Sequence, residues 1–309
     1  MTSDRPPLAS GALDRDAATR MHPERLRAAW DEPGARLLLL RGVEIPVRRS
    51  GGVLRLALRP VAGSYALTDP ETGGAGHVYL GRTAEGPVFG APDRGDIEGG
   101  DLDGEEWRHP FEVGGSLGDT ERELVAVASA LLRWHENAGF SSRDGSATAP
   151  EYGGWARRDA HGGELFPRTD PAVIVLIEHE DRVLLGSNAL WDTGRFSLLA
   201  GFVEAGESLE QTVAREVFEE SGVRVGEIEY VTSQPWPFPR SLMLGFRARL
   251  APGTDPDDLH PDPEEISELR WFSRRELREP MPGITLPMPM SIARWMIDRW
   301  VAEGDAGGE

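Results

Sequence analysis

The residues best suited to chemistry lie in the run Arg-Glu-Val-Phe-Glu-Glu that begins at Arg215. On a helix, Glu216, Glu219 and Glu220 are related by three and four residues and share one adjacent face. Carboxylates this close repel one another unless a cation neutralises them, and oxygen ligands on a rigid helix favour Mg²⁺ or Mn²⁺. Arg215 can pair with Glu219 or with Glu207 and so hold carboxylates in position. The pattern predicts a divalent-metal site.

The helix that must position these side chains has recognisable ends. Ser208 and Gln211 form a capping box that starts a helix at Ser208, and Gly222 suits the left-handed residue that ends it. Its buried stripe consists of apolar residues spaced by four, Leu209, Val213 and Val217. The glycines of loop 201–207 let the backbone approach the same ions. A solvated acidic face would explain three glutamates alone, but not the glycines, the arginine and the cap at these spacings.

Short apolar runs predict the strands and helices around this segment. In the first half we expect strands at Arg36–Leu40, Val53–Leu58, His77–Leu80 and Gly86–Phe89, and a helix over Asp119–His135. In the second half we expect a hairpin of Ala172–Ile177 and Val183–Leu185, strands at Phe196–Leu199, Ile228–Thr232 and Leu242–Leu250, and a helix over Ile292–Val301. These elements predict an N-terminal α+β domain over 1–137, a linker over 138–170, a catalytic domain over 171–302 and a disordered tail over 303–309.

Composition excludes several classes of function. Among the 309 residues, 52 Asp and Glu oppose 33 basic residues, and the net charge of −19 disfavours binding to DNA unless a local patch opposes the global field. There is no lysine, which excludes Schiff-base chemistry, and no cysteine, which excludes thiolate zinc sites and disulfides. No apolar run approaches the ~20 residues that span a bilayer, and no secretory signal is visible, so we expect a cytoplasmic location and no membrane partner.

The run from Gly201 to Val223 resembles the Nudix box at every defined position: Gly, five residues, Glu, seven residues, then Arg-Glu-apolar-x-Glu-Glu-x-Gly-apolar. This resemblance implies an α+β fold, a Nudix α/β/α sandwich with a mixed sheet, here preceded by a smaller α+β domain. Nudix hydrolases cleave nucleoside diphosphates linked to another group, using divalent metals and a water nucleophile.

A second motif, Ser-Gln-Pro-Trp-Pro-Phe-Pro-Arg-Ser from Ser233, resembles the signature of the NADH pyrophosphatase branch. Its three prolines fix the backbone and lower the entropy cost of presenting Trp236 and Phe238 for stacking on a base or nicotinamide. A Pro-rich core loop with buried aromatics is the alternative. The resemblance implies hydrolysis of NADH or NAD⁺ to AMP and NMN(H) by a homodimer.

The resemblance also implies a set of site residues. The catalytic group comprises Arg215, Glu216, Glu219 and Glu220, with Glu219 a candidate general base. The Mg²⁺ or Mn²⁺ ligands would be the Ala200 carbonyl, Glu216, Glu219, Glu220 and Glu265, although Glu264 and Glu268 compete with the last. The dinucleotide site would be lined by Phe166, Gln234, Pro235, Trp236, Pro237, Phe238, Pro239, Arg240, Ser241, Glu265 and Ala293.

The branch usually carries a four-cysteine zinc ribbon between its two domains. Here the corresponding positions hold Ser141, Asp144, Arg158 and His161, which do not make a structural zinc site, so we predict no zinc. We expect packing of Phe140, Trp155 and Phe166 to replace its contribution to folding, and His161 to be an ordinary surface residue.

Two alternatives to NAD(H) hydrolysis remain. Removal of NAD caps from RNA 5′ ends would use the same bond and site, but it needs a path for RNA on an acidic protein. A non-catalytic nucleotide sensor would be expected to have lost box carboxylates and to carry a DNA-binding domain, whereas this box is complete.

Overall fold

The computed structural model describes residues 4–9, 11, 13–69, 71–95, 102–279 and 281–306, which form two compact units. The C-terminal unit contains residues 170–235 and 241–306 together with residues 4–9, and the N-terminal unit contains the described part of 11–169 together with 236–240. The Ser233–Ser241 motif is therefore divided between the two units.

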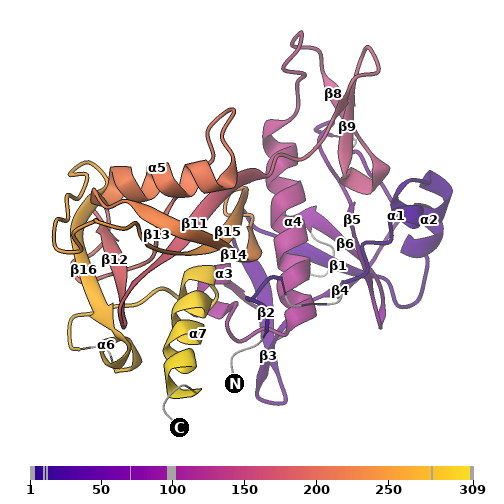
Figure 1. The fold of residues 1–309 in the computed structure, drawn as a ribbon. Helices are drawn as coiled ribbons and strands as arrows, with labels where there is room; N and C mark the ends of the chain where they lie inside the picture. The colour runs from indigo at the N-terminus through magenta and orange to yellow at the C-terminus, as the bar shows by residue number, and fades with distance from the viewer. Residues whose placement is uncertain are drawn as a thin grey trace. The chain divides into compact units, whose positions relative to one another are not determined.

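The C-terminal unit is built on a six-stranded mixed sheet (Figure 1). Its strands run in the order β14-β15-β11-β12-β16, with β13 paired to β11; β11 and β15 are parallel and the β11 pairs with β12 and β13 are antiparallel. The strands are β11 (Asp170–His179), β12 (Arg182–Asn188), β13 (Leu199–Phe202), β14 (Val225–Trp236), β15 (Ser241–Leu250) and β16 (Ile266–Ser273). The helices are α5 (Leu209–Ser221), α6 (Arg274–Arg278) and α7 (Ile292–Ala306).

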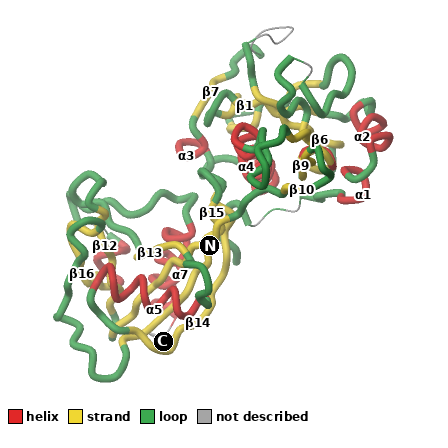
Figure 2. The backbone as a smooth tube through the Cα atoms, turned by 90° about the horizontal axis from the view of Figure 1, so that it is seen from above, coloured by secondary structure: helices red, strands yellow, loops and turns green. Residues whose placement is uncertain are grey.

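The central strand β11 shows why the sheet is covered on both faces. Successive side chains of a strand point to opposite faces. Val173, Val175 and Ile177 pack in one cluster with Val213 and Val217 of α5. The alternate side chains Ile174 and Leu176 pack with the apolar residues of α7, which include Ile292, Met296, Ile297 and Trp300. The result is an α/β/α sandwich, and Figure 2 shows α5 lying over the strands of the sheet.

Most of the predicted C-terminal elements are present, with shifted ends. The predicted strand Phe196–Leu199 overlaps β13 at Leu199 only, because residues 196–198 lead into the strand and bury Phe196 and Leu198 against α7. The sequence analysis did not predict β16, in which two exposed polar residues, Ser267 and Glu268, and half-buried Arg270 interrupt the apolar alternation. Helix α7 runs to Ala306, so the first four residues of the predicted disordered tail have a helical backbone.

The N-terminal unit packs one long helix against short strands. Its four-stranded sheet has the order β4-β1-β6-β5, and a three-stranded sheet has the order β3-β2-β7. The strands are β1 (Arg36–Leu40), β2 (Ile45–Ser50), β3 (Val53–Leu56), β4 (Arg59–Pro60), β5 (Val78–Thr83), β6 (Gly86–Pro92) and β7 (Glu106–Arg108). The helices are α1 (Ala17–Arg20), α2 (Pro23–Trp30), α3 (Pro110–Val113) and α4 (Asp119–Asn137).

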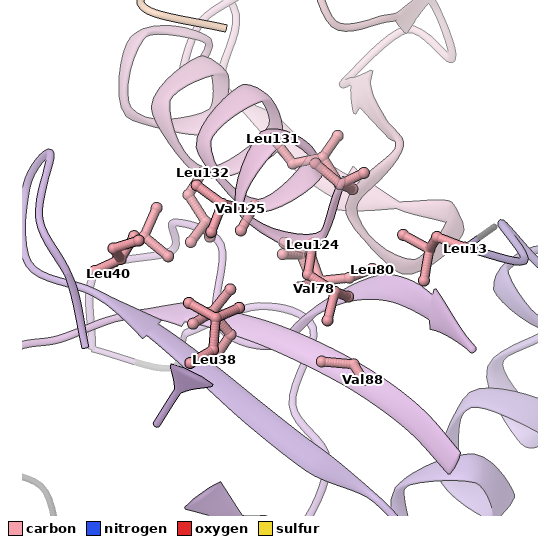
Figure 3. Close-up of a cluster of buried hydrophobic side chains, with 14 of the residues drawn as sticks. Leu13, Leu38, Leu40, Val78, Leu80, Val88, Leu124, Val125, Leu131 and Leu132 are labelled. Carbon is pink, nitrogen blue, oxygen red and sulfur yellow. The ribbon is translucent and has the colours of Figure 1, made fainter. Parts of the chain in front are cut away.

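Helix α4 supplies one side of the N-terminal core. Figure 3 shows its Leu124, Val125, Leu131 and Leu132 directed toward apolar side chains of the strands. Those strand residues are Leu38, Leu40, Val78, Leu80 and Val88. The apolar spacing predicted a helix over Asp119–His135, and residues 123–129 of α4 are all buried, so the middle of this helix is covered on every side.

A second three-stranded sheet occupies the segment where the family resemblance places a zinc ribbon. It is formed by β8 (Thr148–Glu151), β9 (Ala156–Asp159) and β10 (Glu164–Leu165), with a short 3-10 turn over Tyr152–Gly154. The expected replacement of zinc by packing of Phe140, Trp155 and Phe166 is wrong for two of the three residues. Phe140 is 71% exposed and Phe166 is 58% exposed, whereas Trp155 packs against the N-terminal core.

Ser141, Asp144, Arg158 and His161, which stand where the resemblance implies cysteines, all make polar contacts. Arg158 contacts Glu151 and Glu164, with its Nη2 atom 2.7 and 2.9 Å from their carboxylates. Ser141 donates to Asp159, and His161 lies 3.3 Å from the carboxylate of Asp144. Serine, aspartate, arginine and a single histidine do not make a set of structural zinc ligands.

Candidate active site

Helix α5 begins and ends as the sequence predicts. The Ser208 backbone N–H donates to Gln211 at 2.8 Å, and the Ser208 hydroxyl accepts the Gln211 N–H at 3.3 Å. Gly222 has φ 78°, a left-handed conformation, and its N–H donates to the carbonyl of Phe218. Because both ends are fixed, the acidic residues keep their positions relative to the buried stripe.

Arg215 ties the loop before α5 to the helix. Its Nε and Nη2 donate to the two oxygens of Glu207 at 2.7 and 2.9 Å, a bidentate pair. Its Nη1 donates to Glu216 at 2.9 Å and to Glu219 at 3.0 Å. Nη2 also donates to the carbonyl of Phe202, at the end of β13. The arginine therefore contacts both partners that the sequence offered as alternatives, and Glu216 as well.

Glu207 is a charged residue that holds loop 201–207 in position. Hydrogen bonds from Arg215 above all, together with those from the Glu204 N–H and the Thr212 hydroxyl, lower the pKa of Glu207 to about 2. The carboxylate of Glu207 consequently stays ionised at neutral and mildly acidic pH. Its role in the structure is to hold Arg215 and the loop rather than to move a proton.

Glu220 is the most perturbed acid of the group. Its side chain is 6% exposed; it accepts the backbone N–H of Ala200, while its Oε2 atom has no hydrogen-bond partner among the residues that the structure describes. Burial, and then the nearby charges of Glu216 and Glu265, raise the pKa of Glu220 to about 8. A buried carboxylate oxygen without a donor is costly unless a cation or a proton satisfies it.

Glu216 lies against the backbone of β13, and Gly201 makes that approach possible. A Cβ atom added at Gly201 would lie 1.9 Å from the carboxylate carbon of Glu216. Burial, followed by the charges of Glu219 and Glu265, raises the pKa of Glu216, although Arg215 opposes the shift. The close approach of Glu216, and not the backbone conformation, is therefore the reason for a glycine here, since its φ is not in the left-handed region.

The acidic segment before β16 reaches the same group of carboxylates. Glu265 raises the pKa of both Glu216 and Glu220 through its charge, and Asp262 adds to the effect on Glu220. This effect on both helix carboxylates is the observation that favours Glu265 over Glu264 and Glu268. Sequence reasoning missed Asp262, although it begins the Asp-Pro-Glu-Glu run in which Glu265 was chosen; its carbonyl accepts the Glu265 N–H at 3.2 Å.

The carboxylates suit a divalent cation by their chemistry, but they are not yet arranged as ligands. Over the residues that the structure describes, no three acidic or histidine side chains form a ready-made metal cluster. The unpartnered Oε2 of Glu220 and the mutual electrostatic strain of Glu216, Glu220 and Glu265 are what a cation would relieve. The oxygen-only donor set fits Mg²⁺ or Mn²⁺ rather than zinc.

Gln234, from the second motif, makes hydrogen bonds through both the nitrogen and the oxygen of its side-chain amide. It is completely buried; its Nε2 donates to the carbonyls of Pro7 at 2.6 Å and Met290 at 2.9 Å. Its Oε1 accepts the N–H of Ile292 at 2.8 Å, at the start of α7. The amide therefore holds the N-terminal segment at Pro7 and the start of α7, where Ala293 follows Ile292.

The aromatic residues of the second motif form a cluster in the N-terminal unit. Trp236 stacks on Phe111 with ring centroids 5.2 Å apart, and Phe238 meets Phe111 edge-on at 5.1 Å. Both motif side chains are half-buried, and Phe238 also contacts the N-terminal core. Pro237 between them is buried. The aromatic side chains of this loop are thus partly buried, as the alternative of a Pro-rich core loop expects, while their role in stacking on a ligand stays a prediction.

The remaining predicted binding residues are dispersed. Phe166, Pro239 and Arg240 are exposed on the N-terminal unit, whereas Ala293 is buried in the α7 cluster of the C-terminal unit. Pro235 and Ser241 lie at the ends of β14 and β15, and Ser241 is paired in register with Asp170. Exposed Phe166 is the one of these with an apolar surface free to stack on a ring.

A family model described as the NUDIX domain matches residues 168–288, and relatives at 41% identity align along nearly the whole chain, so the chain belongs to the Nudix family. One such relative, from Mycobacterium bovis (strain BCG / Pasteur 1173P2), is called NAD-capped RNA hydrolase NudC; the alignment covers 96% of this chain and 95% of that one. The human NAD-capped RNA hydrolase NUDT12 is 38% identical over 60% of this chain and 43% of its own.

The family assignment confirms the Nudix α/β/α sandwich predicted from the box. Among solved structures, a NUDIX hydrolase from Nitrosomonas europaea aligns with 54% of this chain and 93% of its own, at 27% identity and a TM-score of 0.44. Within the described residues, no helix is long and apolar enough to cross a membrane.

Proposed function

We propose that the protein hydrolyses the pyrophosphate bond of NADH or NAD⁺, giving AMP and NMN(H), with Mg²⁺ or Mn²⁺. The observation that carries this proposal is the environment of Glu220: a buried carboxylate with one unpartnered oxygen, beside Glu216 and Glu265. Anionic groups gathered in this way need a cation, and a pyrophosphate substrate needs the same cation to offset its own charge.

Glu216, Glu220 and Glu265 would hold the metal, with Glu219 and the Ala200 carbonyl as further ligands. When bound, the metal would neutralise the pyrophosphate and lower the pKa of a coordinated water. Glu219 is half exposed and contacts Arg215, and this exposure to solvent supports its role as the candidate proton acceptor. Arg215 and Glu207 would keep the carboxylates in place through the reaction.

The choice of NAD rests on the second motif and on the relatives. The exposed ring of Phe166 and the aromatic pair Trp236 and Phe238 would bind the rings of the dinucleotide by stacking. Gln234 would act indirectly, by fixing the start of α7 beside Ala293. Curated relatives that match along the whole chain carry names that refer to NAD.

Removal of NAD caps from RNA 5′ ends is the second candidate. The names of the relatives at 41% identity favour it directly, and it uses the same bond and the same carboxylates. We also propose, from the family resemblance, that the protein is a cytoplasmic homodimer. Light scattering at working concentration tests the oligomeric state, since a monomer would contradict that proposal.

Parallel assays of NADH and NAD-capped RNA with Mg²⁺ or Mn²⁺ test these functions. Rapid formation of AMP and NMNH that disappears with a chelator supports NAD(H) hydrolysis. Cleavage of the RNA alone moves the function to cap removal. Tight binding of NAD without cleavage of either substrate would contradict both and leave a nucleotide sensor.

A further inference from the structure

The loop between β12 and β13, residues 189–198, exposes apolar side chains in the C-terminal unit. Leu190 is almost wholly exposed, and its neighbour Trp191 is 36% exposed. Exposed apolar patches often mark sites where a ligand binds. What this loop can bind therefore depends on where the backbone holds it.

Backbone hydrogen bonds hold the start of the loop next to a proposed metal ligand. The N–H of Ala189 donates to the carbonyl of Glu265 at 2.8 Å, where the pairing of β12 with β16 ends. Asn188 then accepts the N–H of Leu190 at 2.9 Å through its side chain and the N–H of Trp191 at 3.0 Å through its carbonyl. Trp191 is therefore fixed within two residues of a direct contact with Glu265.

The far end of the loop is joined to the segment that leads into α7. The N–H of Thr285 donates to the carbonyl of Gly194 at 2.8 Å. A Cβ atom added at Gly194 would lie 1.9 Å from the carbonyl oxygen of Gly283, so the two backbones are in direct contact. The segment continues into α7, which carries Ala293. The loop is thus fixed between Glu265 and the chain that leads to a proposed dinucleotide-binding residue.

Arg195 adds a positive charge to this loop. Its Cζ atom lies 4.8 Å from the centroid of the Trp191 ring, a cation–π contact. Within the described part of the chain, the guanidinium has no ion-pair or hydrogen-bond partner. Its donors are therefore available to a phosphate, which guanidinium groups bind in a planar, bidentate manner. The loop presents together the two groups that recognise a ring and the phosphate attached to it.

A dinucleotide has two rings, and the stacking residues of the proposed function do not account for both in one unit. Phe166, Trp236 and Phe238 all belong to the N-terminal unit, whereas the carboxylates belong to the C-terminal unit. Trp191 supplies an exposed aromatic ring within the unit that carries the carboxylates.

We propose that Trp191 and Arg195 bind one mononucleotide half of the dinucleotide substrate, with its ring stacked on the indole and its phosphate on the guanidinium. Stacking on an aromatic side chain is available to every base because each has a π-face, so the AMP half and the NMN half share this chemistry. The two side chains are binding and specificity residues. The inference rests on the proposed function and adds a ring site to its carboxylates.

Binding of AMP, NMN and inorganic pyrophosphate, measured by calorimetry with Mg²⁺, tests this site without any turnover. In Trp191→Leu we expect the Kd of one mononucleotide to rise at least about fivefold, with that of pyrophosphate unchanged. Trp191→Phe, which keeps a ring, should retain most of the affinity. Unchanged Kd values for both mononucleotides, an equal loss for pyrophosphate, or no binding of either mononucleotide to the wild type would overturn the proposal.

Phe218→Leu is the matched control. Phe218 is also exposed, with the Cζ atom of Arg224 4.6 Å from its ring centroid. It is two residues from both Glu216 and Glu220, which places it on the opposite side of α5. This variant should bind all three probes as the wild type does. A loss equal to that of Trp191→Leu would show a general effect of removing an exposed ring and contradict the proposal.

Arg195→Ala tests the second half of the site. It should weaken the same mononucleotide as Trp191→Leu but leave binding of the corresponding nucleoside, which lacks the phosphate, unchanged. Equal weakening of nucleotide and nucleoside, or of neither, would contradict the role of Arg195.

Steady-state hydrolysis of NADH separates this inference from the proposed function. We expect Trp191→Leu to raise KM at least about fivefold with kcat unchanged, since stacking binds substrate and transition state alike. If the wild type hydrolyses NADH and Trp191→Leu keeps its KM, the ring site is wrong and the proposed function stands. If Trp191 binds a mononucleotide but the wild type cleaves no dinucleotide, the ring site stands and the proposed function is wrong.

Discussion

Replacing Gly201 with alanine should lower the catalytic rate much more than it lowers the stability of the fold. A Cβ at this position would lie 1.9 Å from the Glu216 carboxylate carbon, whereas carbon atoms in contact are normally about 3.5 Å apart. The carboxylate must therefore move by roughly 1.5 Å. Because it is the far end of a side chain, the move should cost only about 1 kcal/mol of folding free energy.

The effect on catalysis should be much larger. A displacement of about 1 Å in a catalytic group lowers the rate by about 100-fold, which corresponds to about 2.7 kcal/mol of activation free energy. We therefore expect Gly201→Ala to lose at least that factor in kcat for NADH and to need more Mg²⁺ for half-maximal rate. Initial rates over a Mg²⁺ series and thermal unfolding of the same samples give both quantities.

Gly226→Ala is the matched control, since the nearest atom to an added Cβ there is 3.9 Å away. It should leave rate and stability unchanged. Wild-type kcat in Gly201→Ala would refute the reasoning, because Glu216 could then be displaced without consequence. Unfolding of Gly201→Ala by several kcal/mol would refute it as well, because the contact would then be structural.

Three further outcomes follow from the same contacts. Glu220→Gln should abolish turnover without lowering the melting temperature of the metal-free protein, because glutamine keeps the shape of a buried carboxyl group whose pKa is raised to about 8 and which therefore mostly carries a proton at neutral pH; wild-type rates would refute the metal assignment. Arg215→Lys should lower kcat at least tenfold because lysine cannot make the bidentate pair with Glu207, and steady-state rates that match wild type would contradict this. Burial lowers the pKa of His135 to about 4, so the unfolded state binds the extra proton and stability is lost as pH falls from about 6.5 toward 4, by about 3 kcal/mol in total. Denaturant unfolding at pH 7 and pH 4.5 should therefore show a larger loss of unfolding free energy in the wild type than in His135→Gln. An equal loss in the two proteins would show that His135 does not contribute.

The sequence predicted α5 closely because its signals are local. Ser208 and Gly222 fix the two ends through contacts within a few residues, and the apolar spacing fixes the buried face. The same is true of the hairpin formed by β11 and β12. The strand β13 was placed three residues early because Phe196 and Leu198 are buried for a tertiary reason, in the cluster with α7.

The binding residues were harder to interpret because long-range contacts decide what each side chain can do. Gln234 was expected to line the dinucleotide site, yet its partners Pro7 and Met290 lie far away in sequence. The stacking of Trp236 on Phe111 could not be predicted for the same reason. No local pattern predicts the contacts of Arg158 with Glu164 or of Asp159 with Ser141, since these partners become neighbours only when the segment folds.

Titration of Mn²⁺ into the protein without substrate tests the central claim most directly, because the spectroscopic signal of free Mn²⁺ counts the bound ion independently of activity. We predict a saturable site in the wild type whose affinity falls at least tenfold in Glu220→Gln and in Glu265→Gln. Equal Mn²⁺ affinity in the wild type and both variants would contradict the account, because the carboxylates gathered around Glu220 would then not be a metal site.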